Sequence, residues 1–80
     1  MNDFLLSHRH HPDECEATFA AWHGFSSPLR GGAAPSTCLI GDHRIWWWVR
    51  AGDEAEALAQ LPDYVARRTE AVRVRAVDIP

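Results

Sequence analysis

The sequence predicts a single α+β domain in which a four-stranded antiparallel sheet carries two helices on one face. Three observations lead to this prediction. Apolar and polar residues alternate near both ends of the chain, two stretches have the periodicity of amphipathic helices, and two runs rich in β-branched and aromatic residues flank a Gly41-Asp42 pair. The expected element order is therefore β-α-β-β-α-β.

The first strand is predicted over residues 3–10, where one side of the strand would carry Phe4, Leu6, His8 and His10. A helix is expected to begin at Pro12, because proline fits the first helical turn, and to end at Gly24. Its predicted buried stripe has i, i+4, i+7 spacing and consists of Cys15, Phe19 and Trp22.

The second half begins with a loop over residues 25–36, which are rich in Gly, Ser and Pro. Residues 37–51 are predicted to form a hairpin that turns at Gly41-Asp42. A helix is expected over residues 52–70, with Asp53 as its N-cap and with Pro62 either kinking it or starting a second segment. Residues 71–79 alternate and predict the last strand.

This order is that of the ferredoxin-like fold, the split β-α-β arrangement, within one domain spanning residues 1–80. Domains of this size bury only about 60–65% of the surface that the unfolded chain exposes. They are commonly reinforced by a disulfide, a metal ion or a second subunit.

The composition limits the kinds of partner that the protein is expected to bind. All eight basic residues are arginines, the formal net charge is -3, and no basic cluster indicates a nucleic-acid partner. No stretch resembles a signal peptide or approaches the 20 or so apolar residues of a membrane span, which predicts a cytoplasmic protein without membrane contact. In that compartment Cys15 and Cys38 are expected to be reduced thiols rather than a disulfide.

One face of the predicted sheet would be bare and would carry Trp46, Trp48, Arg44 and Arg73. Exposed tryptophans form an apolar patch of a kind that monomers rarely leave open. Either a second subunit covers this face in a homodimer, which could also enclose a ligand cleft, or the loop over residues 25–36 folds across it.

The run "TCLIGDHRIWWWVRAGDEAEALAQLP" and the closing "VRVRAVDIP" resemble small bacterial members of the dimeric α+β barrel superfamily. The resembling groups include one described as nickel-binding and several without an assigned function. The resemblance implies a ferredoxin-like homodimer. It implies no particular activity, because the superfamily includes cofactor-free monooxygenases, isomerases, haem-handling enzymes and ligand binders.

The stretch "SHRHHPDEC" carries the candidate metal ligands His8, His10 and Cys15. Imidazole favours zinc, copper, iron or nickel, and a thiolate strengthens such a site. Together with the resemblance to a nickel-binding group, this gives nickel or zinc as the expected metal. His11 is an alternative ligand, and Asp13 or Glu14 could add a carboxylate. Alternatively, Cys15 is simply a small core residue. The two strand histidines are expected on the bare face, and His43 is expected to be solvated.

The leading hypothesis is therefore a small dimer that binds a transition metal or a small ligand near the end of the first strand. A second hypothesis is a cofactor-free enzyme, or an accessory protein, acting on a small aromatic compound in a cleft lined by Trp46 and Trp48. A third is a plain protein-interaction module. No catalytic residue is identifiable, and the sequence leaves open whether the protein is an enzyme.

Overall fold

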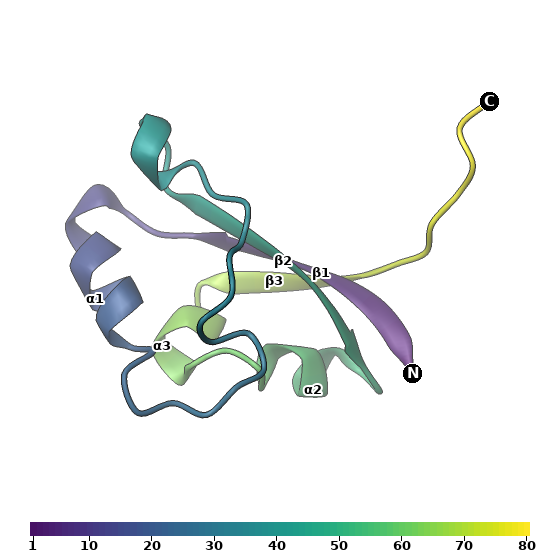
Figure 1. Cartoon of the computed structure of the whole chain (residues 1–80), viewed down its shortest axis with the longest axis horizontal. Coiled ribbons are helices and arrows are strands. Elements are labelled where there is room, and N and C mark those ends of the chain that lie inside the picture. The colour runs from purple at the N-terminus through teal and green to yellow at the C-terminus, as the bar shows by residue number, and fades with distance from the viewer.

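A computed structural model describes residues 1–80 and shows a three-stranded antiparallel sheet with the strand order β2-β1-β3 (Figure 1). The strands are β1 (Asn2–Arg9), β2 (Arg44–Ala51) and β3 (Thr69–Val74). The α-helices are α1 (Cys15–Ala20), α2 (Glu54–Leu58) and α3 (Asp63–Ala66), and two short 3-10 turns are η1 (Pro12–Glu14) and η2 (Cys38–Ile40). No helix has the length and apolar character needed to cross a membrane.

The predicted four-stranded ferredoxin-like sheet is wrong, because residues 37–40 do not form a strand. They make the turn η2, which ends at Gly41 with a φ of 105°. The preceding chain meets β2 only at an isolated bridge between Ser36 and Ile45. Pro35 has no backbone N–H to donate, and the Thr37 hydroxyl accepts a hydrogen bond from the Arg44 N–H. These contacts fix the start of β2 without a regular ladder.

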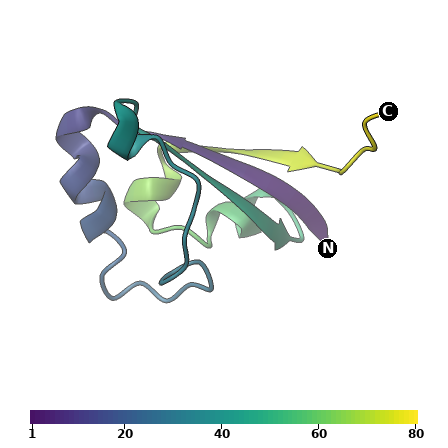
Figure 2. The ribbon, with the colours of Figure 1, turned by 45° about the horizontal axis from the view of Figure 1, so that its top comes forward.

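All three helices lie on one side of the sheet (Figure 2). The covered face of β1 and β2 supplies Phe4, Leu6, Val49 and Ala51 to the core, and the helical layer supplies Ala57, Leu61 and Val65. Each of these side chains is at most 4% exposed. Burying one large aliphatic side chain stabilises a fold by about 1.5–3 kcal/mol, so this small interface between sheet and helices is the main source of stability.

The helical stretch after β2 confirms two predictions. The Asp53 carboxylate accepts a hydrogen bond from the Glu56 N–H at 2.8 Å, as an N-cap does. Pro62 separates α2 from α3, because a proline cannot continue the helical hydrogen-bond ladder. The loop predicted over residues 25–36 is also confirmed, since it holds no helix and only the one isolated bridge.

The opposite face of the sheet is not covered by any helix. Leu5 is paired with Trp48 on one side and with Val72 on the other, and directly paired residues share a face. Trp48 is 56% exposed and Val72 is 43% exposed. Trp46, opposite Ser7 in the same register, lies on this open face as well.

The last strand has the opposite phase to the predicted one. Arg73 is paired with Phe4 and therefore shares the helix-covered side of the sheet, whereas Val72 is on the open face. The phase is set where the strand begins, because the Thr69 hydroxyl donates a hydrogen bond to the Val65 carbonyl of α3 at 2.7 Å. Thr69 therefore faces the helices, and every second residue after it, including Arg73, shares that direction.

His8 and His10 also lie on the covered side, so the expectation that they face the open side is wrong. His8 is fully buried and His10 is 5% exposed. The strand period places His8 on the same face as Phe4 and Leu6, which the helical layer covers. Burial of two imidazoles requires hydrogen-bond partners, and these partners build the site described next.

Candidate metal centre

Two histidines and two cysteines converge at one end of the sheet. The potential ligand atoms of His10, Cys15, Cys38 and His43 all lie within 4.8 Å of one another. His10 follows β1, Cys15 begins α1, Cys38 begins η2 and His43 precedes β2. Two stretches that lie far apart along the chain, residues 10–15 and 38–43, therefore contribute two ligands each.

The two histidines are brought together by the sheet itself. The His10 N–H donates a hydrogen bond to the His43 carbonyl at 3.0 Å, which continues the β1–β2 pairing beyond the ends of both strands. The two imidazole rings consequently have a centroid separation of 5.2 Å. The buried Nδ1 of His43 has no hydrogen-bond partner. A buried imidazole nitrogen without a partner is unusual, and a metal ion would satisfy it.

Cys38 is positioned by its loop. Its N–H donates a hydrogen bond to the Ser36 hydroxyl at 3.1 Å, and the Thr37 N–H donates to the Arg44 carbonyl at 3.0 Å. The Cys38 Sγ then lies 3.8 Å from the Nε2 of His10. In a tetrahedral zinc site the ligand atoms are about 3.3–3.8 Å apart, because Zn–N and Zn–S bonds are about 2.0–2.3 Å long. For one nitrogen and one sulfur ligand the spacing is about 3.5–3.6 Å, so this pair lies slightly wider than two zinc ligands and a small inward movement would bring it to that spacing.

Cys15 is positioned by the residue that precedes it. The Glu14 carboxylate accepts hydrogen bonds from the Arg68 guanidinium, at 2.9 Å, and from the Tyr64 hydroxyl, at 3.2 Å. These bonds tie the start of α1 to the segment around α3. The Glu14 carboxylate also accepts the His11 N–H, and this bond together with Arg68 lowers its pKa to about 2. The carboxylate therefore stays ionised and holds the turn in place.

The thiol of Cys15 is shifted toward its protonated form. Burial, followed by the proximity of Cys38, raises the pKa of Cys15. Two neighbouring thiolates repel each other unless a cation lies between them. A bound divalent cation would remove that repulsion and stabilise both thiolates, so metal binding at this site must release protons.

A chain of hydrogen bonds behind the site orients His10. The Thr69 hydroxyl donates to Val65, so it accepts the Nδ1–H of His8 at 3.0 Å. The Nε2 of His8 then accepts the Nδ1–H of His10 at 2.9 Å. From this network we assign the free lone pair of His10 to Nε2, the nitrogen beside Cys38.

Burial keeps the paired imidazoles neutral. Burial, followed by the proximity of His10, lowers the pKa of His8. Burial, followed by the proximity of His43, lowers the pKa of His10. Neutral imidazole is the form that ligates metal ions, so both shifts favour a metal-binding arrangement near neutral pH.

Two of the three predicted metal ligands, His10 and Cys15, belong to the cluster. His8 does not, because its ring nitrogens are engaged by Thr69 and His10. His11 and Asp13 are exposed, and Glu14 is paired with Arg68.

Cys38 and His43 were not predicted as ligands, because a regular hairpin over residues 37–51 would leave His43 solvated. A symmetric spacing could have indicated them. Four residues separate His10 from Cys15, and four separate Cys38 from His43, so the sequence holds an H-x4-C pair and a C-x4-H pair.

The residues predicted to line a dimer face are divided by the structure. Trp46, Trp48 and Arg44 share the open face, where Arg44 forms an ion pair with Asp42 at 2.9 Å. Arg73 lies on the other side of the sheet, as described above. No histidine accompanies the two tryptophans, so the predicted aromatic cleft with an imidazole is not formed on this face of the chain.

No protein-family model, curated protein or solved structure matches this chain.

Proposed function

We propose that this protein binds one transition metal ion, of the zinc class, through His10, Cys15, Cys38 and His43. The observation that carries the proposal is the convergence of four ligand atoms within 4.8 Å. Two further features support it: the orphaned Nδ1 of His43 and the hydrogen-bonded chain that orients His10. Imidazole rings that ligate a metal commonly have their second nitrogen fixed in this manner.

The donor set favours zinc over nickel. A set of two imidazoles and two thiolates is typical of tetrahedral zinc sites, whereas Ni(II) prefers square-planar or tetragonal sites. The four protein ligands would complete a tetrahedral shell and leave no open position for a substrate. The site therefore suits storage, buffering or sensing of a metal, or metal-dependent stabilisation of the fold, rather than metal catalysis.

Metal binding would also suit a domain of this size. An ion at this site would join the turn after β1 to the loop before β2, and small domains commonly rely on such a link. Because both proposed cysteine ligands are free thiols, we expect the protein to function in a reducing compartment such as the cytoplasm.

The test is metal analysis of untagged protein, followed by Co(II) titration and competition with Zn(II). We expect one metal per chain, and visible Co(II) absorption typical of tetrahedral thiolate coordination that Zn(II) abolishes. Cys38→Ser and His43→Ala should each lose most of the affinity. His23→Ala, which changes an exposed histidine outside the cluster, is the matched control. Absence of stoichiometric metal, together with no binding tighter than micromolar, would overturn the proposal.

We also propose that a second copy of the chain covers the open face of the sheet. Trp48, Leu5 and Val72 form an apolar row across the three strands, Trp46 lies two residues from Trp48 on the same face of β2, and Trp48 remains more than half exposed in one chain. Tryptophan is strongly enriched at the centres of protein interfaces. Light scattering should give a dimer mass that Trp48→Glu converts to a monomer. A monomer at high concentration in the unmodified protein would contradict this.

A further inference from the structure

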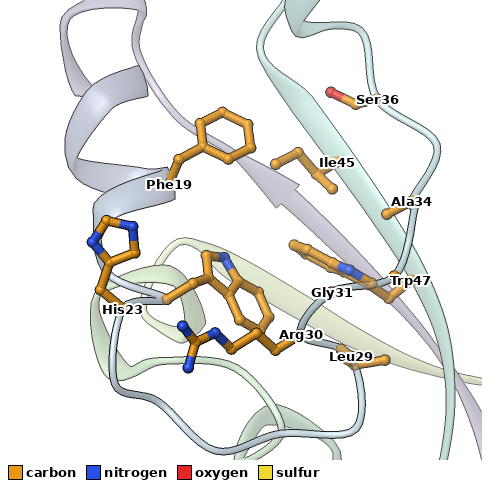
Figure 3. A pocket seen from close by; sticks show the side chains of 11 residues that line it. Phe19, His23, Leu29, Arg30, Gly31, Ala34, Ser36, Ile45 and Trp47 are labelled. Carbon is orange, nitrogen blue, oxygen red and sulfur yellow. The ribbon is translucent and has the colours of Figure 1, made fainter.

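An apolar hollow lies beside the four candidate metal ligands, on the helix-covered side of β2 (Figure 3). Its volume is about 340 Å³, which is within the lower range of small-molecule sites. The apolar part of its lining comes from α1 and the turn after it, from the loop over residues 25–36 and from β2, and consists of Phe19, Trp22, Leu29, Ala34, Ile45 and Trp47.

Three aromatic side chains bound the hollow. The Trp22 and Trp47 indoles have a centroid separation of 5.9 Å and an interplanar angle of 47°, so their planes diverge. Phe19 borders the space from α1 (Figure 3), and the residue is 48% exposed. Aromatic rings gain about 0.5–1.5 kcal/mol from stacked or edge-to-face contacts beyond the burial of their area. An aromatic ring held in the hollow would gain such contacts with these side chains.

The polar part of the lining carries one permanent positive charge, on Arg30. Arg30 and His23 lie near each other at one margin of the hollow (Figure 3), and no acidic residue lines it. Arg30 forms no ion pair within the chain, and its guanidinium makes only a long contact of 3.5 Å with the Phe25 carbonyl. An arginine with free donors at the edge of an aromatic pocket is complementary to a carboxylate, which it can bind through two parallel hydrogen bonds.

We propose that this hollow is a binding site for a planar aromatic carboxylate, with the ring against Phe19, Trp22 and Trp47 and the carboxylate at Arg30. None of these residues is one of the four candidate metal ligands, so this proposal does not depend on metal binding. The sites are nevertheless adjacent, because the Phe19 ring contacts the His10 ring edge-on at a centroid distance of 6.5 Å.

The experiment uses 2-naphthoate as the probe and 2-naphthalenemethanol as its neutral counterpart. Binding is measured from amide and indole shifts in heteronuclear NMR spectra, supported by quenching of tryptophan fluorescence. We expect shifts confined to the loop over residues 25–36, α1 and the Trp22 and Trp47 indoles. The carboxylate should bind roughly tenfold more tightly than the alcohol, and salt should weaken this preference.

Three variants test the assignment. Arg30→Gln should remove the preference for the carboxylate, whereas Arg73→Gln, which also changes an arginine without an ion pair but lies outside the hollow, should leave it unchanged. Ala34→Leu should fill the hollow and weaken binding of both probes, with the amide spectrum reporting that the fold is intact. Equal affinity for the two probes, shifts centred on Trp46 and Trp48, or unchanged binding by Arg30→Gln would each overturn the proposal.

Discussion

The Nε2 of His8 lies 2.9 Å from the Nδ1 of His10, and both imidazoles are buried on the helix-covered face of the sheet. His8 is thus not a member of the four-residue cluster but the hydrogen-bond partner of one of its members. Its other nitrogen lies 3.0 Å from the Thr69 hydroxyl, which is itself tied to α3. The orientation of a proposed metal ligand therefore depends on packing between β1, β3 and α3.

Replacing His8 should weaken metal binding without removing a ligand. Because His8 holds the Nδ1–H of His10, His8→Ala should lower Zn(II) affinity by about 10- to 100-fold, the usual cost of losing such a partner. Competition against a chelator of known affinity measures this. Thr69→Val should have a smaller effect in the same direction, and His11→Ala, on an exposed side chain, should have none. An unchanged affinity in His8→Ala would show that His10 is oriented by other contacts.

Metal removal should lower the thermal stability of the folded protein. At free metal one hundred times the dissociation constant, binding adds about 2.7 kcal/mol to the free energy of unfolding. For a chain of 80 residues this corresponds to roughly 10–20 °C in Tm. Calorimetry with and without a chelator measures the shift, and Cys15→Ser should abolish the difference. A chelator effect that persists in Cys15→Ser would place the responsible metal elsewhere.

The metal-free protein should lose stability in mild acid. The pKa values of His8 and His10 are lowered from 6.5 in the folded state, chiefly by burial. The unfolded chain therefore binds more protons than the folded chain in mild acid. The contribution of the two histidines to the free energy of unfolding is fully present above pH 6.5 and is lost as the pH falls below it. Urea denaturation at pH 7.5 and pH 5.5 measures this. His8→Asn combined with His10→Asn should flatten the dependence, whereas His23→Asn should preserve it.

The Glu14 carboxylate, which accepts the His11 N–H and pairs with Arg68 at 2.8 Å, should contribute stability at a lower pH. The folded-state pKa of Glu14 is about 2, against an ordinary value of 4.5. Its contribution is therefore present above pH 4.5 and is lost as the pH falls from 4.5 toward 2. Glu14→Gln should lack this component of the acid transition, while Glu16→Gln, on an exposed carboxylate without an ion pair, should retain it. Identical acid transitions in both variants would contradict this assignment.

Truncating the core should be far more costly than truncating the loop tip. Leu6 is fully buried between the sheet and the helices, and Leu39 is fully exposed on η2. Leu6→Ala should lower the free energy of unfolding by about 2–5 kcal/mol. Leu39→Ala should change it by less than about 0.5 kcal/mol. Urea denaturation of both variants with metal present gives the comparison, and similar costs would show that the core is placed incorrectly.

Local sequence patterns predicted the elements whose stability is local. The alternation in residues 3–10 marks β1, the Asp53 carboxylate caps α2, and Pro62 lies between α2 and α3 as the N-cap of α3. These features depend on strand period, capping and the missing N–H of proline, all of which act within a few residues. The H-x4-C and C-x4-H spacings of the candidate metal ligands are likewise visible in the sequence.

Tertiary contacts decided the rest. The Thr37–Arg44 hydrogen bonds close a loop that carries Cys38 and His43, where the sequence predicts a strand. The Thr69–Val65 hydrogen bond sets the phase of β3, which places Arg73 on the covered side of the sheet. Likewise, the helices cover the face that carries His8 and His10. Cys15 and Cys38 meet because sheet pairing draws distant segments together. Such long-range contacts depend on how the loops close and on which face of the sheet the helices bury. Neither property produces a periodic pattern of residues, so local sequence patterns do not predict it.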